Sequence, residues 1–233
     1  MANKFICTLL VIAVWATSTS ADGIENGSPT TIKAHPYVVS LQGTDGTRVC
    51  GGALIDSKTV VTAAQCLANY DVSQLVVGVS NGAKTVKIAK STFDVNFDYV
   101  TMENDVAVVI LKKAVSVGSI PIASSQPKTG ATGVVTGWSA SNALVDVSES
   151  IISATDCVSG DYSYEEGEVL STMLCGLAAN KACNALPGSP LVSNKKLVGL
   201  VSWGYGCVNS ANPAVFTNIA SVSSWIKTTV KSL

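Results

Sequence analysis

The chain has 233 residues, of which 47% are hydrophobic and 13% are charged, with 19 glycines and a formal net charge of -1 at pH 7. This composition excludes a disordered chain, because there is ample apolar material for a core. The near-zero net charge argues against a basic face for nucleic acid or an anionic membrane, although a balanced total can hide local patches. We expect one compact body.

The first residues, Met1 to Ala21, have the features of a secretory signal peptide. An early Lys4 precedes an apolar stretch from Phe5 to Ala16, which is too short to span a bilayer and ends in small residues. The alternative is a buried N-terminal helix or strand. We expect the mature protein to begin near Asp22 or Ile24, and to be extracellular and independent of a membrane.

Short apolar runs rich in β-branched residues recur along the mature chain, separated by Gly, Asp and Asn, and indicate the strands of a sandwich or barrel. They are residues 37–41, 59–62, 75–77, 85–88, 106–111, 134–136, 197–203 and 214–216.

Three further segments depart from this strand pattern. Residues 116–133 contain Pro and Gly among small polar residues and predict a connector between two strand-rich halves. Residues 141–167 are acidic and poor in strand signals, so we expect exposed loops there, suited to binding. At the C-terminus, Ser221 or Ser223 is expected to cap a helix with the apolar face Val222, Trp225, Ile226, Val230 and Leu233.

Six cysteines remain once Cys7 is removed with the signal peptide. An oxidising destination favours disulfides over metal ligation, because the chain has a single histidine and no Cys-x-x-Cys pair. Six cysteines allow fifteen pairings, and the residues themselves do not choose between them. No metal or other cofactor is expected. The six are Cys50, Cys66, Cys157, Cys175, Cys183 and Cys207.

Several ordered segments, from Ile24 to the end of the chain, resemble the trypsin-like serine proteases. They are His35–Leu41, Cys50–Ile55, Val61–Cys66, Asn104–Ala107, Thr136–Trp138, Cys183–Pro190, Val201–Cys207 and Ser224–Ile226. The resemblance implies an all-β fold of two packed antiparallel six-stranded barrels, at about 24–120 and 121–220, with a cleft between them and a C-terminal helix at about 221–233. It also implies the disulfides Cys50–Cys66, Cys157–Cys175 and Cys183–Cys207.

By the same resemblance, the catalytic triad positions hold Gln65, Asp105 and Pro187. The glutamine amide cannot accept a proton as an imidazole does, and proline has neither a hydroxyl nor a backbone N–H. The oxyanion hole, formed at Ala185 and Pro187, therefore lacks one donor. We expect no catalytic residues and no enzyme, with Asp105 as a structural carboxylate that takes donors such as the Gln65 amide.

The resemblance also leads to expectations for other residues. The single histidine, His35, is expected to be solvated or capping at the edge of a strand, and Ser189 or Ser202 would be the nucleophile of a residual hydrolase. Leu186 stands where an aspartate pairs with a newly cleaved N-terminus in active members, and Ile24 follows Gly23 with no basic cleavage residue.

The remnant specificity pocket is assigned, by resemblance, to Lys181, Ser202, Gly204 and Ala214. Lys181 occupies the position that sets the charge at the base of the pocket. We expect its side chain to reach solvent or to fill a collapsed pocket, in preference to recognising an acidic group.

The loss of both histidine and serine makes the chain most similar to the scabies mite inactivated protease paralogues, relatives of trypsin-like mite allergens. Members of that group are secreted by the parasite and interfere with host complement. The resemblance implies a secreted, monomeric binding protein that inhibits host defence through complement components and does not bind nucleic acid. The alternatives are a residual or rewired serine hydrolase and a decoy that binds protease inhibitors or substrates.

Overall fold

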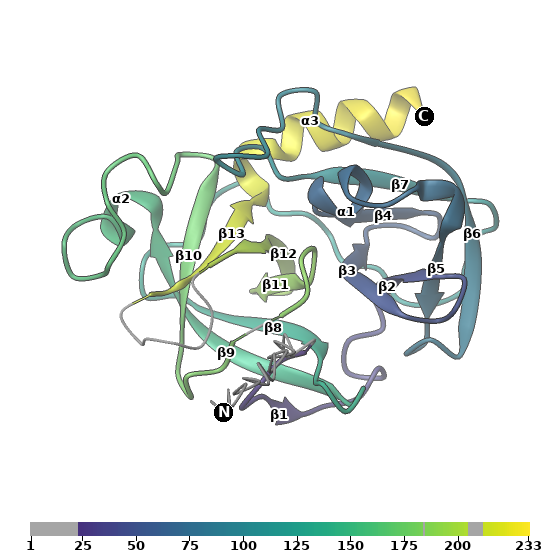
Figure 1. The fold of residues 1–233 in the computed structure, drawn as a ribbon, viewed down its shortest axis with the longest axis horizontal. Coiled ribbons are helices and arrows are strands. Elements are labelled where there is room, and N and C mark those ends of the chain that lie inside the picture. Colours follow the sequence, from purple (N-terminus) through teal and green to yellow (C-terminus); the bar gives the residue numbers. More distant parts are fainter. Residues whose placement is uncertain (1–22, 184, 205–211) are drawn as a thin grey trace, which may run out of the picture.

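The computed structural model describes residues 23–183, 185–204 and 212–233, in which two β-barrels lie side by side (Figure 1). The predicted signal peptide and Cys207 lie outside these residues. Within the described part of the chain, no helix is both long and apolar enough to cross a membrane.

The first barrel closes in the strand order β2-β3-β4-β7-β6-β5. Its strands are β2 (Val38–Gly43), β3 (Arg48–Leu54), β4 (Thr59–Thr62), β5 (Leu75–Val79), β6 (Lys84–Phe93) and β7 (Ala107–Leu111). The β-branched runs predicted as strands supply its interior, and all four residues of β4 are buried. Two short helices, α1 (Gln65–Ala68) and η1 (Val72–Gln74), connect β4 to β5.

The second barrel closes in the order β8-β9-β10-β13-β12-β11, because β8 pairs with both β9 and β11. Its strands are β8 (Thr132–Trp138), β9 (Leu144–Ser153), β10 (Met173–Ala178), β11 (Pro190–Ser193), β12 (Lys196–Trp203) and β13 (Ala214–Asn218). A short strand, β1 (Ser28–Pro29), adds to the edge of β9. All named pairings are antiparallel, so the predicted architecture of two six-stranded barrels is confirmed.

The segment 141–167, predicted to be exposed loops, instead contains β9 and the short helix α2 (Ala154–Cys157). Side chains of β9 alternate in burial: Val145, Val147, Glu149 and Ile151 are buried, while Ser148 and Ser150 are exposed. The strand was missed because acidic and hydroxyl residues interrupt its apolar residues. Its place between β8 and β10 makes it a central part of the second barrel.

Two of the disulfides implied by the resemblance are present, Cys50–Cys66 and Cys157–Cys175. The first ties β3 to α1, and the second ties α2 to β10. Cys183 is also disulfide-bonded. Its predicted partner, Cys207, is outside the described residues.

The C-terminal helix α3 (Ile219–Ser232) begins before the serines predicted to cap it, so that prediction is wrong. Asn218 is the N-cap, and its side-chain oxygen accepts a hydrogen bond of 3.1 Å from the Ala220 N–H. The predicted apolar face is confirmed, since Val222 and Ile226 are buried in a cluster that includes residues of the first barrel. In Figure 1, α3 lies across both barrels.

The cap assignment predicts a difference between two substitutions. Asn218→Ala removes the cap and also the hydrogen bond of 2.8 Å that the Asn218 amide donates to Gln126, so we expect a loss of about 1–2 kcal/mol in the free energy of unfolding. Ser221→Ala changes an exposed residue within the helix and should cost about 0.5 kcal/mol or less. Urea unfolding of the two variants measures the difference, and equal losses would show that Asn218 is not the cap.

Candidate functional site

A cavity of about 190 Å³ opens in the second barrel beside the junction of the two barrels. Ser202, Gly204 and Ala214, three of the predicted pocket residues, line it, together with Trp203. The remaining walls are mostly apolar and come from β8, β9, β12, β13 and the segment before β11. They include Ile24, Val135, Val147, Ala182, Cys183, Ala185, Val201 and Phe216.

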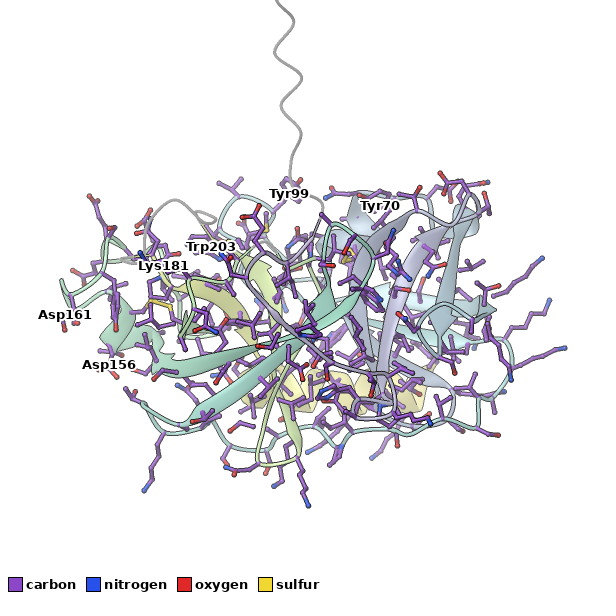
Figure 2. The ribbon with its side chains drawn as sticks, turned by 90° about the horizontal axis from the view of Figure 1, so that it is seen from below. Tyr70, Tyr99, Asp156, Asp161, Lys181 and Trp203 are labelled. Atoms are coloured by element: carbon purple, nitrogen blue, oxygen red, sulfur yellow. A yellow bond between two sulfur atoms is a disulfide. The ribbon has the colours of Figure 1, made fainter. Side chains whose placement is uncertain are left out.

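Lys181, the fourth predicted pocket residue, does not line the cavity. Its side chain is exposed, and its backbone has a φ of 53°, in the left-handed region. Ala182, the next residue, takes part in the wall instead. The expectation that Lys181 reaches solvent is confirmed, and the cavity therefore contains no lysine from the described chain. Figure 2 labels Lys181 and Trp203 on the same side of the molecule.

Glu149 of β9 supplies an acidic group that the sequence analysis missed. Its side chain lines the cavity, is only 4% exposed, and has one carboxyl oxygen, Oε2, with no hydrogen-bond partner among the described residues. Burial raises the pKa of this carboxyl to about 8. The alternation of buried residues along β9, with Glu149 in register with Val147 and Ile151, is the signal that would have placed it inside.

Gly176 of β10 provides the room for this carboxyl. A Cβ at this position would lie 3.0 Å from Glu149 Oε2 and 2.9 Å from a ring carbon of Phe216. Any larger residue would therefore displace the carboxyl or the ring. The absence of a side chain at Gly176 is a condition for the shape of the cavity.

The predicted triad positions Gln65 and Asp105 meet in a compact hydrogen-bond network with Ser202. The Gln65 Nε2 group donates to Asp105 Oδ2 at 2.7 Å and to the Ser202 carbonyl at 2.9 Å. The Gln65 backbone N–H donates to Asp105 Oδ1 at 3.0 Å, and the Ser202 hydroxyl donates to Oδ2 at 2.6 Å. The expected pairing of Asp105 with the Gln65 amide is confirmed.

Asp105 is fully buried, and burial raises the pKa of its carboxyl above the usual range, in opposition to these hydrogen bonds, which lower it. Gln65 begins α1, Asp105 precedes β7, and Ser202 belongs to β12. The network therefore joins the first barrel to the second. The Gln65 amide, committed as a donor to two oxygens, has no acid–base chemistry of its own.

Pro187, at the third triad position, belongs to a segment that is fixed to both barrels. Its carbonyl accepts a hydrogen bond of 2.8 Å from Gly51 of β3, and the next N–H, of Gly188, donates to Val201 of β12 at 2.8 Å. Gly188 has a φ of 78°, and a Cβ there would lie 2.3 Å from the Thr62 hydroxyl. The chain therefore turns tightly at the point where the two barrels meet.

The flanking residues at this segment are partly shielded. Ala185 and Leu186 are half-buried, and Ala185 lines the cavity. Ile24 is buried and also lines the cavity, and its backbone N–H donates to the Trp138 carbonyl at 2.8 Å. The wall of the pocket next to Ile24 is thus held by a peptide amide.

The two candidate serine nucleophiles have different surroundings. Ser189 is 1% exposed, and its hydroxyl packs against Gly51, without a hydrogen-bond partner in the described chain. It is inaccessible to a substrate in this conformation. Ser202 is among the residues that line the cavity and is 5% exposed, with its hydroxyl donated to Asp105.

His35, expected to be solvated or to cap the edge of a strand, lies apart from the cavity and is half-buried. Its Nε2 atom is 2.8 Å from Asp146 Oδ2, and its Nδ1 atom is 3.1 Å from the Tyr37 hydroxyl. These contacts fasten the segment before β2 to β9. Across the residues that the structure describes, no group of three or more His, Cys, Asp or Glu side chains is placed to hold a metal ion.

Two closed six-stranded antiparallel barrels with a C-terminal helix are the fold of the trypsin class of proteins. The trypsin family model matches residues 24–226, and the chain belongs to the trypsin-like serine protease family. It is 38% identical to a trypsin of Sarcophaga bullata, with 90% of each chain covered. It is 35% identical to trypsin beta of Drosophila erecta over 96% of this chain and 98% of that protein.

These comparisons correct the expectation that the chain is not an enzyme. The family is one of proteases, and the relatives compared are named trypsins, so family membership points to an enzyme. Positions 65 and 187 of the sequence nevertheless hold glutamine and proline. Peptide hydrolysis at this cleft would have to use groups other than Gln65 and Pro187 for proton transfer and nucleophilic attack.

The buried Glu149 carboxyl predicts a specific pH dependence of stability. Its pKa is about 8 in the folded chain against an ordinary 4.5, so the folded state holds the proton more tightly and loses this advantage as the pH rises from 4.5 to 8. Each pH unit in this window lowers the free energy of unfolding by up to about 1.4 kcal/mol. Glu149→Gln cannot ionise, so between pH 5 and pH 8 we expect it to lose about 3–4 kcal/mol less stability than the wild type.

Urea unfolding at the two pH values measures this difference. The exposed Glu166→Gln serves as the matched control and should follow the wild type. A Glu149→Gln variant whose stability runs parallel to the wild type would show that this carboxyl is already ionised at pH 5.

Proposed function

We propose that this chain is a secreted binding protein that inhibits host defence by engaging a component of the complement cascade, and that it does so by receiving a basic side chain of its partner in the cavity. The observation that carries the proposal is the buried Glu149 Oε2 atom, which has no hydrogen-bond partner among the described residues and lies in a mostly apolar pocket. Asn212, which also lines the pocket, adds a second buried oxygen without a partner there, Oδ1. The similarity of the triad positions to the scabies mite paralogues supports the choice of target.

The chemistry of the pocket favours a long basic side chain over other ligands. Val147 and Phe216 offer apolar contacts to the methylene stem of a lysine or arginine, and the Glu149 carboxyl offers a counter-charge at the inner end. A buried carboxyl is costly to ionise alone, but an arriving cation compensates the charge. The partner's cation would thus complete a hydrogen-bonding site that the folded chain leaves incomplete.

Dose-dependent inhibition of complement-mediated lysis by the purified protein is the expected result. Removing the charge with Glu149→Gln should weaken inhibition by about 30-fold or more, because truncating one member of a buried charge pair typically costs at least about 2 kcal/mol of binding energy. Glu166→Gln is the matched control and should inhibit as the wild type does. Absence of inhibition by the wild type would refute the target, and full inhibition by Glu149→Gln would refute the role of the pocket.

Peptide hydrolysis is a second candidate function, favoured by family membership and by relatives that are named trypsins. Ser202 and Asp105 form the hydroxyl–carboxylate pair at the cavity, and their separation of 2.6 Å allows the carboxylate to take the hydroxyl proton as Oγ attacks a carbonyl. The same pocket would also suit a decoy that captures protease inhibitors through a basic side chain.

Ser202→Ala tests the hydrolytic candidate directly. We expect any cleavage of chromogenic peptides after lysine or arginine by the wild type to disappear in Ser202→Ala, together with labelling by a serine-directed covalent probe. The variant should still bind benzamidine with an affinity close to that of the wild type, because Glu149 is retained. Cleavage that persists unchanged in the variant would exclude Ser202 as the nucleophile.

A further inference from the structure

A second hollow, of about 830 Å³, lies on the first barrel, away from the cleft. It is bounded by the end of β5, the start of β6 and the segment that follows β7. Four lysines line it: Lys84, Lys87, Lys112 and Lys113, and all four are exposed. We call this hollow the lysine groove. In Figure 1, β5 and β6 are at the opposite end of the molecule from α2.

Backbone pairing sets the positions from which the four lysines extend. Lys84 pairs with Val79 across β5 and β6, and the Lys112 N–H donates to the Lys87 carbonyl at 2.8 Å. The Val115 N–H then donates to the Ser57 carbonyl at 2.8 Å, which fixes the segment after β7. The positive charges therefore extend from an ordered frame of neighbouring strands.

These charges are not neutralised by neighbouring carboxylates. No acidic residue lines the lysine groove, and none of its four lysines forms an ion pair within the described chain. Asp56 is close in sequence to Ser57, but its carboxylate accepts hydrogen bonds from the Lys58 and Thr59 N–H groups in its own turn.

Five of the sixteen acidic residues of the chain lie together in one stretch of sequence outside the lysine groove. Asp156 and Asp161, labelled at one end of the molecule in Figure 2, begin an acidic stretch. Glu165, Glu166 and Glu168 continue it. The small net charge of -1 thus conceals two separated regions of opposite sign.

We propose that the lysine groove is a binding site for a sulfated polysaccharide. Lysine is a compact, flexible point charge that suits sulfate groups without a fixed pairing geometry. Three hydroxyl side chains in the lining, Ser80, Thr85 and Ser116, can hydrogen-bond to sulfate or sugar oxygens. The half-buried Val86 and Val117 offer an apolar floor to the carbon-bound faces of the sugar rings.

The lining also disfavours other polyanions. It contains no arginine, the residue suited to bidentate pairing with the carboxylates of an acidic peptide. It contains no aromatic residue, so it lacks both a stacking platform for nucleic-acid bases and the typical anchor of a protein interface. Among polyanions, a sulfated polysaccharide, which is recognised by its charge density and by contacts with hydroxyl groups, fits this lining best.

Heparin is the probe for this site. The wild-type protein should bind heparin at about 0.15 M NaCl, with an affinity that falls as salt rises, and should not bind desulfated heparin. Replacing Lys84, Lys87, Lys112 and Lys113 together by glutamine should lower the affinity at least about tenfold. Replacing the same four by arginine, which keeps the charge, should preserve binding, and equal unfolding midpoints would establish that the variants are folded.

The matched control replaces four exposed lysines outside the groove, Lys33, Lys128, Lys196 and Lys227, by glutamine and makes the same change in net charge. It should bind heparin as the wild type does. An equal loss in both quadruple variants would refute a localised site. Competition by polyglutamate or by a DNA oligonucleotide as effective as that by heparin would refute a sulfated ligand.

The heparin-binding results do not depend on the cavity at Glu149. The variant with glutamine at all four positions of the lysine groove retains that cavity, so its inhibition of complement-mediated lysis can be measured independently.

Discussion

The buried carboxylate of Asp105 is the constraint on which the arrangement of the two barrels depends. A fully buried carboxylate must find hydrogen-bond donors, and here they come from both sides, from Gln65 at the start of α1 and from Ser202 on β12. The Thr217 hydroxyl of β13 also donates to the Asp105 backbone carbonyl, at 2.7 Å. The same contacts that satisfy Asp105 therefore hold Ser202 and Trp203 in the wall of the pocket.

Much of the fold could be predicted from short-range patterns. Runs such as 59–62 and 106–111 are rich in β-branched residues and contain no charged residue, and a strand buried in a barrel is the structure that such runs favour. The strand β9 was missed because Glu149 interrupts its buried face while Asp146, Ser148 and Ser150 lie on the other, and local composition cannot reveal that the tertiary structure buries an acid. The helix cap was misplaced because Ile219 and Ala220 extend the helix before the first serine.

The positions of the cleft residues could be predicted because several family motifs occur along this chain in the family's order. Motifs in the same order indicate the same fold, and so the same place for each motif in it. The direction of a side chain was harder to predict. Lys181 occupies a pocket position in sequence, yet its left-handed backbone leads its side chain to solvent. Glu149, distant in sequence from every motif, is brought into the cavity by the alternation of β9.

The hydrogen bond at Ile24 has a consequence for how the pocket wall is held. Ile24 donates its backbone N–H to the Trp138 carbonyl at 2.8 Å, and both residues are buried. Leu186, at the position where an aspartate would pair with a charged terminus, offers no carboxylate. This part of the wall therefore depends on a neutral backbone hydrogen bond, whose strength does not change with the titration of a side chain.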